Sequence, residues 1–114
     1  MNELSFNWPQ IVWIIIAILV LVQATIKHGE YKGGDYNGGA VLIAAAFVNA
    51  LYWIGGFYDT IGLAQVTMIV WMTISVGAHV FKDGEPIESR YNLVKTAIST
   101  GAETFVLYAG GFFT

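Results

Sequence analysis

Long runs of apolar residues, separated by short polar segments, make up most of this chain. Four runs approach the roughly 20 apolar residues that a helix needs to cross about 30 Å of hydrocarbon. They cover about residues 9–26, 39–57, 61–81 and 92–112. The apolar positions are continuous and do not alternate, which favours helices over strands. The pattern therefore predicts an all-α integral membrane protein with four transmembrane helices.

The composition agrees with a membrane protein and narrows its chemistry. The 114 residues suffice for a single domain, 1–114. Only 11% of them are charged and 56% are hydrophobic, whereas a soluble domain carries about 25% charged residues. The net charge of −3 argues against nucleic-acid binding. Cysteine is absent, which excludes disulfides, thiol catalysis and thiolate metal sites.

The basic residues predict an orientation in the membrane. All five lie in the loops 27–38 and 82–91 or at the start of the fourth run: Lys27, Lys32, Lys82, Arg90 and Lys95. The positive-inside bias places these loops in the cytoplasm and both termini outside, in the periplasm. No basic residue precedes the first run, so we expect a retained anchor in the inner membrane rather than a signal peptide. The expected interface anchors are Trp8, Trp13, Trp53 and Tyr58 outside, and Tyr31, Tyr36 and Tyr91 inside.

The two halves of the chain match each other at an offset of 55 residues. Lys27-x-Gly29-Glu30 aligns with Lys82-x-Gly84-Glu85, Tyr36-Asn37 with Tyr91-Asn92, and Gly55-Gly56-Phe57 with Gly110-Gly111-Phe112. Gln10 likewise aligns with Gln65. We interpret this as two tandem helical-hairpin repeats, about 5–59 and 60–114, in parallel orientation because each unit contains an even number of spans. The Asn residues are expected to cap helices and the glycines to end them.

These motifs, followed by Gly-Gly-Phe-Phe at residues 110–113, resemble small integral membrane proteins encoded in tailed-bacteriophage genomes. Those proteins are often a single hairpin, so this chain resembles two fused copies. The resemblance implies a non-enzymatic protein of the host inner membrane with a role in lysis or superinfection exclusion. One departure is that holins usually end in a basic tail, whereas this chain ends Phe112-Phe113-Thr114.

Glu103 is the main candidate functional residue, because a charge near the middle of a span costs from about 3 to above 10 kcal/mol. Asn49, at a similar depth in the second run, is expected to bond to it, unless Glu103 meets its equivalent in a neighbouring protomer. Gly101, with Ala97, forms a small-xxx-small pattern beside the polar stripe. That stripe also contains Thr96, Ser99, Thr100 and Thr104. The set is interpreted as interhelical contacts or, alternatively, as a proton or cation site.

Other chemistry is weakly represented. His28 and His79 lie near the predicted inner interface and are the candidate ligands for a metal or haem, but no third ligand stands at a fixed spacing. Their counterparts at the 55-residue offset are Asp83 and Ala24. The glycine-rich segment 32–39 lacks the ending of a phosphate-binding loop and is expected to be a flexible hairpin loop. We therefore predict no enzyme activity, no metal and no cofactor.

Three functions remain open from the sequence. The first is a non-enzymatic protein that self-associates as a homo-oligomer or docks to another membrane protein within the lipid bilayer, such as a holin-like permeabiliser or an exclusion factor. The second is a small proton- or cation-coupled transporter or conduit that uses Glu103. The third is an accessory subunit of a larger membrane complex.

Overall fold

Four helices joined by loops form the described part of the chain. The computed structural model describes residues 6–114, so the N-terminal tail and the first residue of the predicted first repeat lie outside it. The helices are α1 (Trp8–Ile26), α2 (Gly38–Ile54), α3 (Leu63–Phe81) and α4 (Leu93–Ala109). Across residues 6–114 the only strand-like pairing is two isolated bridges. The prediction of an all-α fold with four helices is confirmed.

The helices differ in length from the predicted spans. α1 and α3 have 19 residues each and are long and apolar enough to cross a membrane. α2 and α4 have 17 residues each, which is about 25 Å of helix. The predicted runs 39–57 and 92–112 were too long at their ends, because the Gly-Gly-Phe segments leave the helix and form turns.

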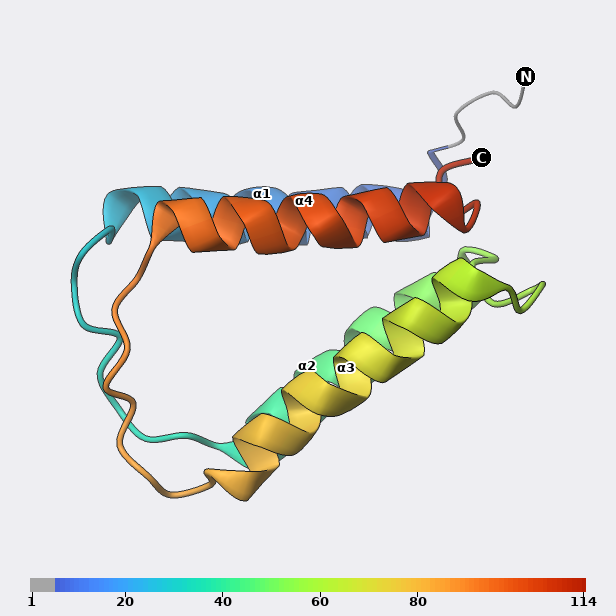
Figure 1. The fold of residues 1–114 in the computed structure, drawn as a ribbon. Helices are drawn as coiled ribbons and strands as arrows, with labels where there is room; N and C mark the ends of the chain where they lie inside the picture. The colour runs from blue at the N-terminus through green and yellow to red at the C-terminus, as the bar shows by residue number, and fades with distance from the viewer. Residues whose placement is uncertain (1–5) are drawn as a thin grey trace.

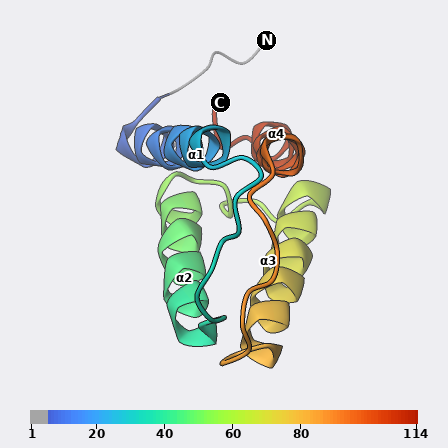
Figure 2. The same ribbon diagram turned by 90° about the vertical axis from the view of Figure 1, so that its left-hand side faces the viewer.

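The helices form two antiparallel pairs stacked as layers. α1 lies beside α4 and α2 lies beside α3, as Figure 1 shows. The layers meet near the C-terminus and the turn between α2 and α3, and they diverge toward the loops 27–37 and 82–92. Those two loops run side by side, as seen from that end in Figure 2.

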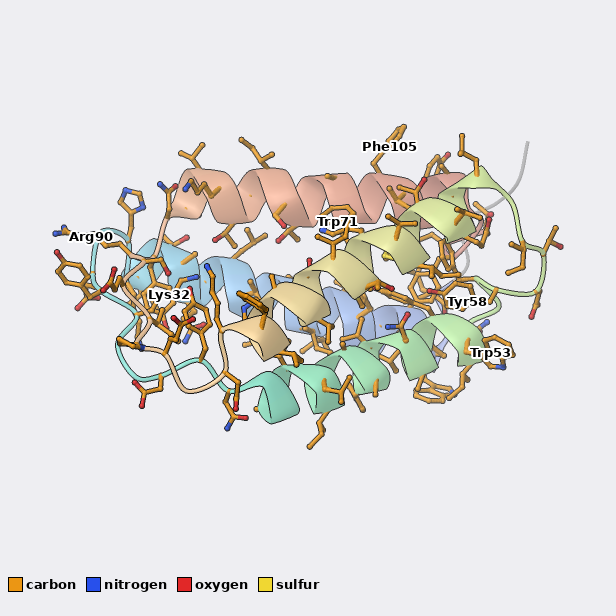
Figure 3. All side chains as sticks on the ribbon, turned by 60° about the horizontal axis from the view of Figure 1, so that its bottom comes forward. Lys32, Trp53, Tyr58, Trp71, Arg90 and Phe105 are labelled. Carbon is orange, nitrogen blue, oxygen red and sulfur yellow. The ribbon has the colours of Figure 1, made fainter. Side chains whose placement is uncertain are left out.

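The buried core sits at the end where the layers meet. Its members come from all four helices and from the segments that follow α2 and α4: Trp13, Leu51, Tyr52, Phe57, Met68, Leu107, Phe112 and Phe113. Aromatic rings pack edge to face here, with centroids 5.4 Å apart for Tyr52 and Phe112. Trp13 is only 5% exposed, so its predicted role as an interface anchor is wrong. Trp53, by contrast, is 69% exposed at this end of the molecule (Figure 3).

Each Gly-Gly-Phe segment closes a helix with a tight turn. Gly56 and Gly111 adopt φ angles of 89° and 88°, which favour glycine. The N–H of Phe57 then donates to the carbonyl of Tyr52 over 2.9 Å, as a Schellman turn requires. The preceding glycine is needed for space, since a Cβ on Gly55 would lie 2.5 Å from the ring of Phe112. The turns thereby direct both phenylalanines into the core.

Two buried glutamines fasten these turns. The Nε2 of Gln10 donates to the carbonyls of Gly55 and Phe112, over 3.3 and 2.8 Å. The Nε2 of Gln65 donates to the carbonyls of Phe57 and Gly110, over 2.8 and 3.0 Å. Adding 55 to a residue of the first half gives its counterpart in the second, so the two sets of bonds correspond one to one. These side chains satisfy carbonyls that a helix end leaves without a partner.

The two long loops are bonded to each other, so the glycine-rich segment is not the free hairpin loop that we expected. The N–H of Gly29 donates to the carbonyl of Tyr91, and the N–H of Gly84 donates to that of Tyr36, over 2.9 and 2.8 Å. Antiparallel bridges link Tyr31 to Arg90 and Asp35 to Pro86. Nearly every one of these contacts has an equivalent at the 55-residue offset.

The helix starts carry the expected caps. Asn37 Oδ1 accepts a hydrogen bond from the N–H of Ala40, and Asn92 Oδ1 accepts one from Lys95, each over 3.0 Å. The Asn caps predicted from the sequence are therefore confirmed.

Candidate functional site around Glu103

Glu103 ends a chain of hydrogen bonds that crosses the core. The indole N–H of Trp13 on α1 donates to the hydroxyl oxygen of Tyr52 on α2, over 2.8 Å. The Tyr52 hydroxyl donates in turn to Oε1 of Glu103 on α4, over 2.6 Å. Tyr52 is fully buried and Trp13 almost so, whereas Glu103 is half-buried. Three helices thus converge on one carboxyl group.

Asn49 does not bond to Glu103, contrary to the expectation from depth. Its Nδ2 donates to the carbonyl of Ala45 over 2.9 Å, and its Oδ1 accepts from the hydroxyl of Tyr58 over 2.9 Å. Partial burial raises the pKa of Tyr58, so this hydroxyl stays protonated and remains a donor. Asn49 therefore fixes the turn after α2, and Tyr52, three residues later, takes the place beside Glu103.

The polar stripe of α4 extends from Glu103 toward the loops. By their helical spacing, Thr96, Ser99 and Thr100 lie on the Glu103 side of α4, between Glu103 and the start of the helix. Thr104 donates to the carbonyl of Thr100 over 2.7 Å. The hydroxyls of Ser99 and Thr100 have no hydrogen-bond partner within residues 6–114.

The small residues of α4 occupy a different side. Gly101 stands two positions from Ser99, which is about 200° around a helix, so one flat surface cannot contain both. Gly101 is exposed, and a Cβ added to it would meet nothing within 4 Å. It lines an apolar groove of about 510 Å³ between α1 and α4, together with Trp13, Ile14 and Thr104. The residues predicted to mediate association on α4 therefore lie on two different sides of the helix: Ser99, Thr100 and Glu103 on a polar side, and Gly101 in the wall of the groove.

The two histidines lie at the loop end and perform separate tasks. His28 Nδ1 accepts a hydrogen bond from the N–H of Leu93, over 3.0 Å, at the start of α4. Its counterpart Asp83 accepts from the N–H of Gly38, over 2.8 Å, at the start of α2. His79 bonds through Nδ1 to the carbonyl of Ser75. Within the described residues no three metal-ligating side chains cluster.

The sequence contained a usable signal for residues that we did not single out. Gln10 and Gln65 are polar, lie inside apolar runs and match at the 55-residue offset, which marks them as residues with a paired structural task. Tyr52 gave no such signal, since a single aromatic residue in a span is most simply interpreted as packing, and Trp13 was expected at the membrane interface. Only the packing of α1, α2 and α4 brings them to Glu103.

Comparison with known protein families, curated proteins and solved structures finds no match to this chain. The class of protein rests on the chain itself: an all-α, four-helix protein with two helices suited by length and composition to a membrane.

Proposed function

We propose that the chain is a four-span protein of the bacterial inner membrane that acts without catalysis, by associating with a second copy of itself. The observation that carries the association is the apolar groove between α1 and α4, with Gly101 exposed in its wall. Small residues allow a second helix to approach closely, and membrane helices associate chiefly through such packing.

Exposed apolar side chains support the placement in a bilayer. Side chains that are each at least 70% exposed occur on all four helices: Ile26, Ile43, Leu63, Phe81 and Phe105. Extensive exposed apolar surface marks sites of contact with a membrane or another protein. The longest dimension of the molecule, 45 Å, corresponds to a bilayer with its headgroups, about 40–45 Å. Lys32 and Arg90 lie at one end, and Trp53 and Tyr58 at the other (Figure 3), which supports cytoplasmic loops and external termini.

The paired contacts support an origin by duplication. Gln10 and Gln65 bind equivalent carbonyls, and the two long loops exchange equivalent hydrogen bonds. Each unit brings two spans, so the halves are related by a two-fold axis along the membrane normal. In this arrangement each hairpin completes the helix ends of the other.

Thiol labelling tests the topology, because the chain has no native cysteine. Single cysteines at Ser89 and Thr60 would be exposed to a membrane-impermeant maleimide in intact cells. We expect Thr60→Cys to react from outside and Ser89→Cys to react only after permeabilisation. Reaction of both from the same side would refute the four-span arrangement.

Cysteine crosslinking tests the association surface. Gly101→Cys and Ala97→Cys lie on the groove side of α4, whereas Ala102→Cys lies about 100–140° away from them on the same helix. We expect oxidation in native membranes to give a disulfide-linked dimer with the first two variants and not with the third. A dimer with Ala102→Cys alone would place the interface elsewhere.

Co-purification with a larger membrane protein, and no homodimer, would favour an accessory subunit.

The phage resemblance adds a physiological role to this proposal, namely a holin-like permeabiliser or an exclusion factor. Induced expression in bacteria distinguishes the two. A permeabiliser collapses the membrane potential, as a potential-sensitive dye reports, whereas an exclusion factor leaves the potential intact and blocks a second phage infection.

A second candidate function, a small proton or cation conduit, is favoured by the polar side of α4. Glu103 accepts one bond from Tyr52, and Thr96, Ser99 and Thr100 lead from it toward the loops. In proteoliposomes that enclose a pH-sensitive dye, Glu103→Gln should abolish flux while the protein still assembles. Unchanged flux in that variant would end the conduit hypothesis.

A further inference from the structure

The loops and the end of α3 border an open surface cavity of about 290 Å³ whose lining includes two lysines. Lys32 comes from the first long loop, Ser89 from the second, and His79 and Lys82 from the end of α3. No carboxylate is among the residues that line it. Glu85 and Glu88 line a neighbouring cavity, which shares Lys82 with this one.

The cavity wall is held in place by contacts between its members. The N–H of Lys32 donates to the carbonyl of Ser89 over 3.1 Å, which ties one loop to the other. The Lys82 ammonium lies 5.4 Å from the ring centroid of Tyr36, and the Tyr36 ring packs edge-on against His79 at 5.6 Å. Neither Lys32 nor Lys82 forms an ion pair within residues 6–114. No carboxylate of these residues therefore neutralises either charge, and the Lys32 ammonium lies 5.7 Å from the ring centroid of Tyr91, which is outside the lining of this cavity.

An imidazole and a serine hydroxyl line this cavity in only one of two equivalent places. At the 55-residue offset, Lys82 corresponds to Lys27, but His79 corresponds to Ala24 and Ser89 to Gly34. Lys32 and Ile87 are each other's counterparts, so the equivalent place also has two lysines, Lys27 and Lys32, whose ammonium groups lie 5.5 and 5.7 Å from the ring centroid of Tyr91. The loop pairing is the same in both places, so it requires neither an imidazole nor a hydroxyl. The polar groups of this cavity therefore have a use other than loop pairing.

We propose that this cavity binds the phosphate group of an anionic phospholipid from the leaflet at the loop end. Lysine binds phosphate as a compact positive charge, and the Ser89 hydroxyl adds a hydrogen-bond donor. Basic pockets at the cytoplasmic ends of membrane helices bind such headgroups. The inference rests on the proposed membrane placement, which puts Lys32 and Lys82 at headgroup depth beside the tyrosines of the interface.

Lipid retention tests the site on the full chain. The protein is reconstituted in nanodiscs of mixed phosphatidylglycerol and phosphatidylcholine, released into detergent, and its retained lipids are counted by native mass spectrometry. We expect the wild type to retain phosphatidylglycerol preferentially. Lys82→Ala and Lys32→Ala should each lower that preference about fivefold. Lys27→Ala, at the equivalent position without His79 and Ser89, should leave it unchanged.

Three outcomes would overturn the proposal. The wild type could retain both lipids equally, or Lys27→Ala could lower the preference as much as Lys82→Ala, which would indicate a general charge effect. Glycerol 3-phosphate could displace the retained lipid at equal concentration, which would make the ligand a soluble phosphate. If Lys82→Ala does not fold, Lys82→Gln keeps the side-chain stem and serves instead.

The labelling of Thr60→Cys and Ser89→Cys separates the two hypotheses. A chain that spans the membrane as proposed but shows no lipid preference refutes only the phosphate site. A chain labelled from one side refutes the membrane placement first.

Discussion

The side-chain amide of Gln10 donates a 2.8 Å hydrogen bond to the carbonyl oxygen of Phe112, 102 positions further along the chain. The bond joins the start of α1 to the turn after α4. Gln65, at the start of α3, makes the equivalent bond to the carbonyl oxygen of Phe57. Each glutamine thus closes the end of a helix in the opposite half, so the two halves stabilise each other at the end where the core lies.

Gln10→Leu and Gln65→Leu should each destabilise the fold by about 1–3 kcal/mol, because buried carbonyls lose their donors. The free energy of unfolding, measured by circular dichroism in detergent during denaturant titration, checks this. Gln23→Leu is the matched control, since Gln23 is exposed and has no side-chain hydrogen bond within residues 6–114. An equal loss of unfolding free energy in all three variants would show that the hydrogen bonds of Gln10 and Gln65 do not stabilise the fold.

Gly110→Ala should destabilise the protein by about 1–3 kcal/mol through overpacking. The added methyl group would collide with the ring of Phe57 and approach Gln65 Nε2 to 2.9 Å. Gly77→Ala is the control, because nothing lies within 4 Å of a Cβ there and alanine is the better helix former. The midpoint of thermal unfolding should fall for the first variant and rise or stay constant for the second. A tolerated Gly110→Ala would contradict the close packing of the two turns.

Tyr52→Phe should cost about 1–3 kcal/mol, because it leaves the indole N–H of Trp13 and the carboxyl group of Glu103 without a shared partner. Glu103→Gln keeps an acceptor oxygen for the Tyr52 hydroxyl, so its cost should be much smaller. A double-mutant cycle of Tyr52→Phe with Glu103→Ala, which removes the acceptor, measures the coupling of the two side chains in the free energy of unfolding. A coupling of zero would mean that the 2.6 Å bond adds nothing to stability.

Asp83→Ala and His28→Ala should each loosen the start of a helix in the other half, at a cost of about 0.5–2 kcal/mol, as for other lost caps. The Asp83 carboxylate accepts a hydrogen bond from the N–H of Gly38, and the His28 ring accepts one from the N–H of Leu93. Hydrogen exchange should therefore rise in the first turn of α2 for Asp83→Ala and of α4 for His28→Ala. Asp83→Asn keeps an acceptor and is the control. Faster exchange throughout both helices in either variant would argue for global destabilisation instead.

The sequence predicted the helices and their order well, because long apolar runs and capping residues act locally. Asn37 and Asn92 cap the helices that were expected, and the glycines after α2 and α4 end them. The helix ends were less accurate. Gly55 and Gly110 are compatible with a helix, and only the packing of Phe57 and Phe112 shows that the chain leaves it there.

The site was predicted less completely than the fold. Glu103 was identified because an acid inside an apolar run is costly whatever the fold. The hydrogen-bond partner of Glu103 was predicted wrongly. Depth in the span favoured Asn49, whereas the structure places the Tyr52 hydroxyl beside the Glu103 carboxyl group. The position of a residue along a span fixes only its depth in the membrane. A hydrogen bond between two helices also requires that both side chains lie on the faces where the helices contact each other.

The sequence by itself determined the four helices, the loop-end clustering of the basic residues and the 55-residue correspondence, because each of these follows from composition and local order. The tertiary structure alone decided that Gln10 and Gln65 bind across the halves, that Trp13 and Tyr52 serve Glu103, and that Lys32 and Lys82 share one cavity. The physical reason is that these contacts join residues 39 to 102 positions apart, except for the bond from Gln65 to Phe57, which spans 8 positions around the turn between α2 and α3. Such contacts exist only once the helix pairs have packed and the loops have crossed.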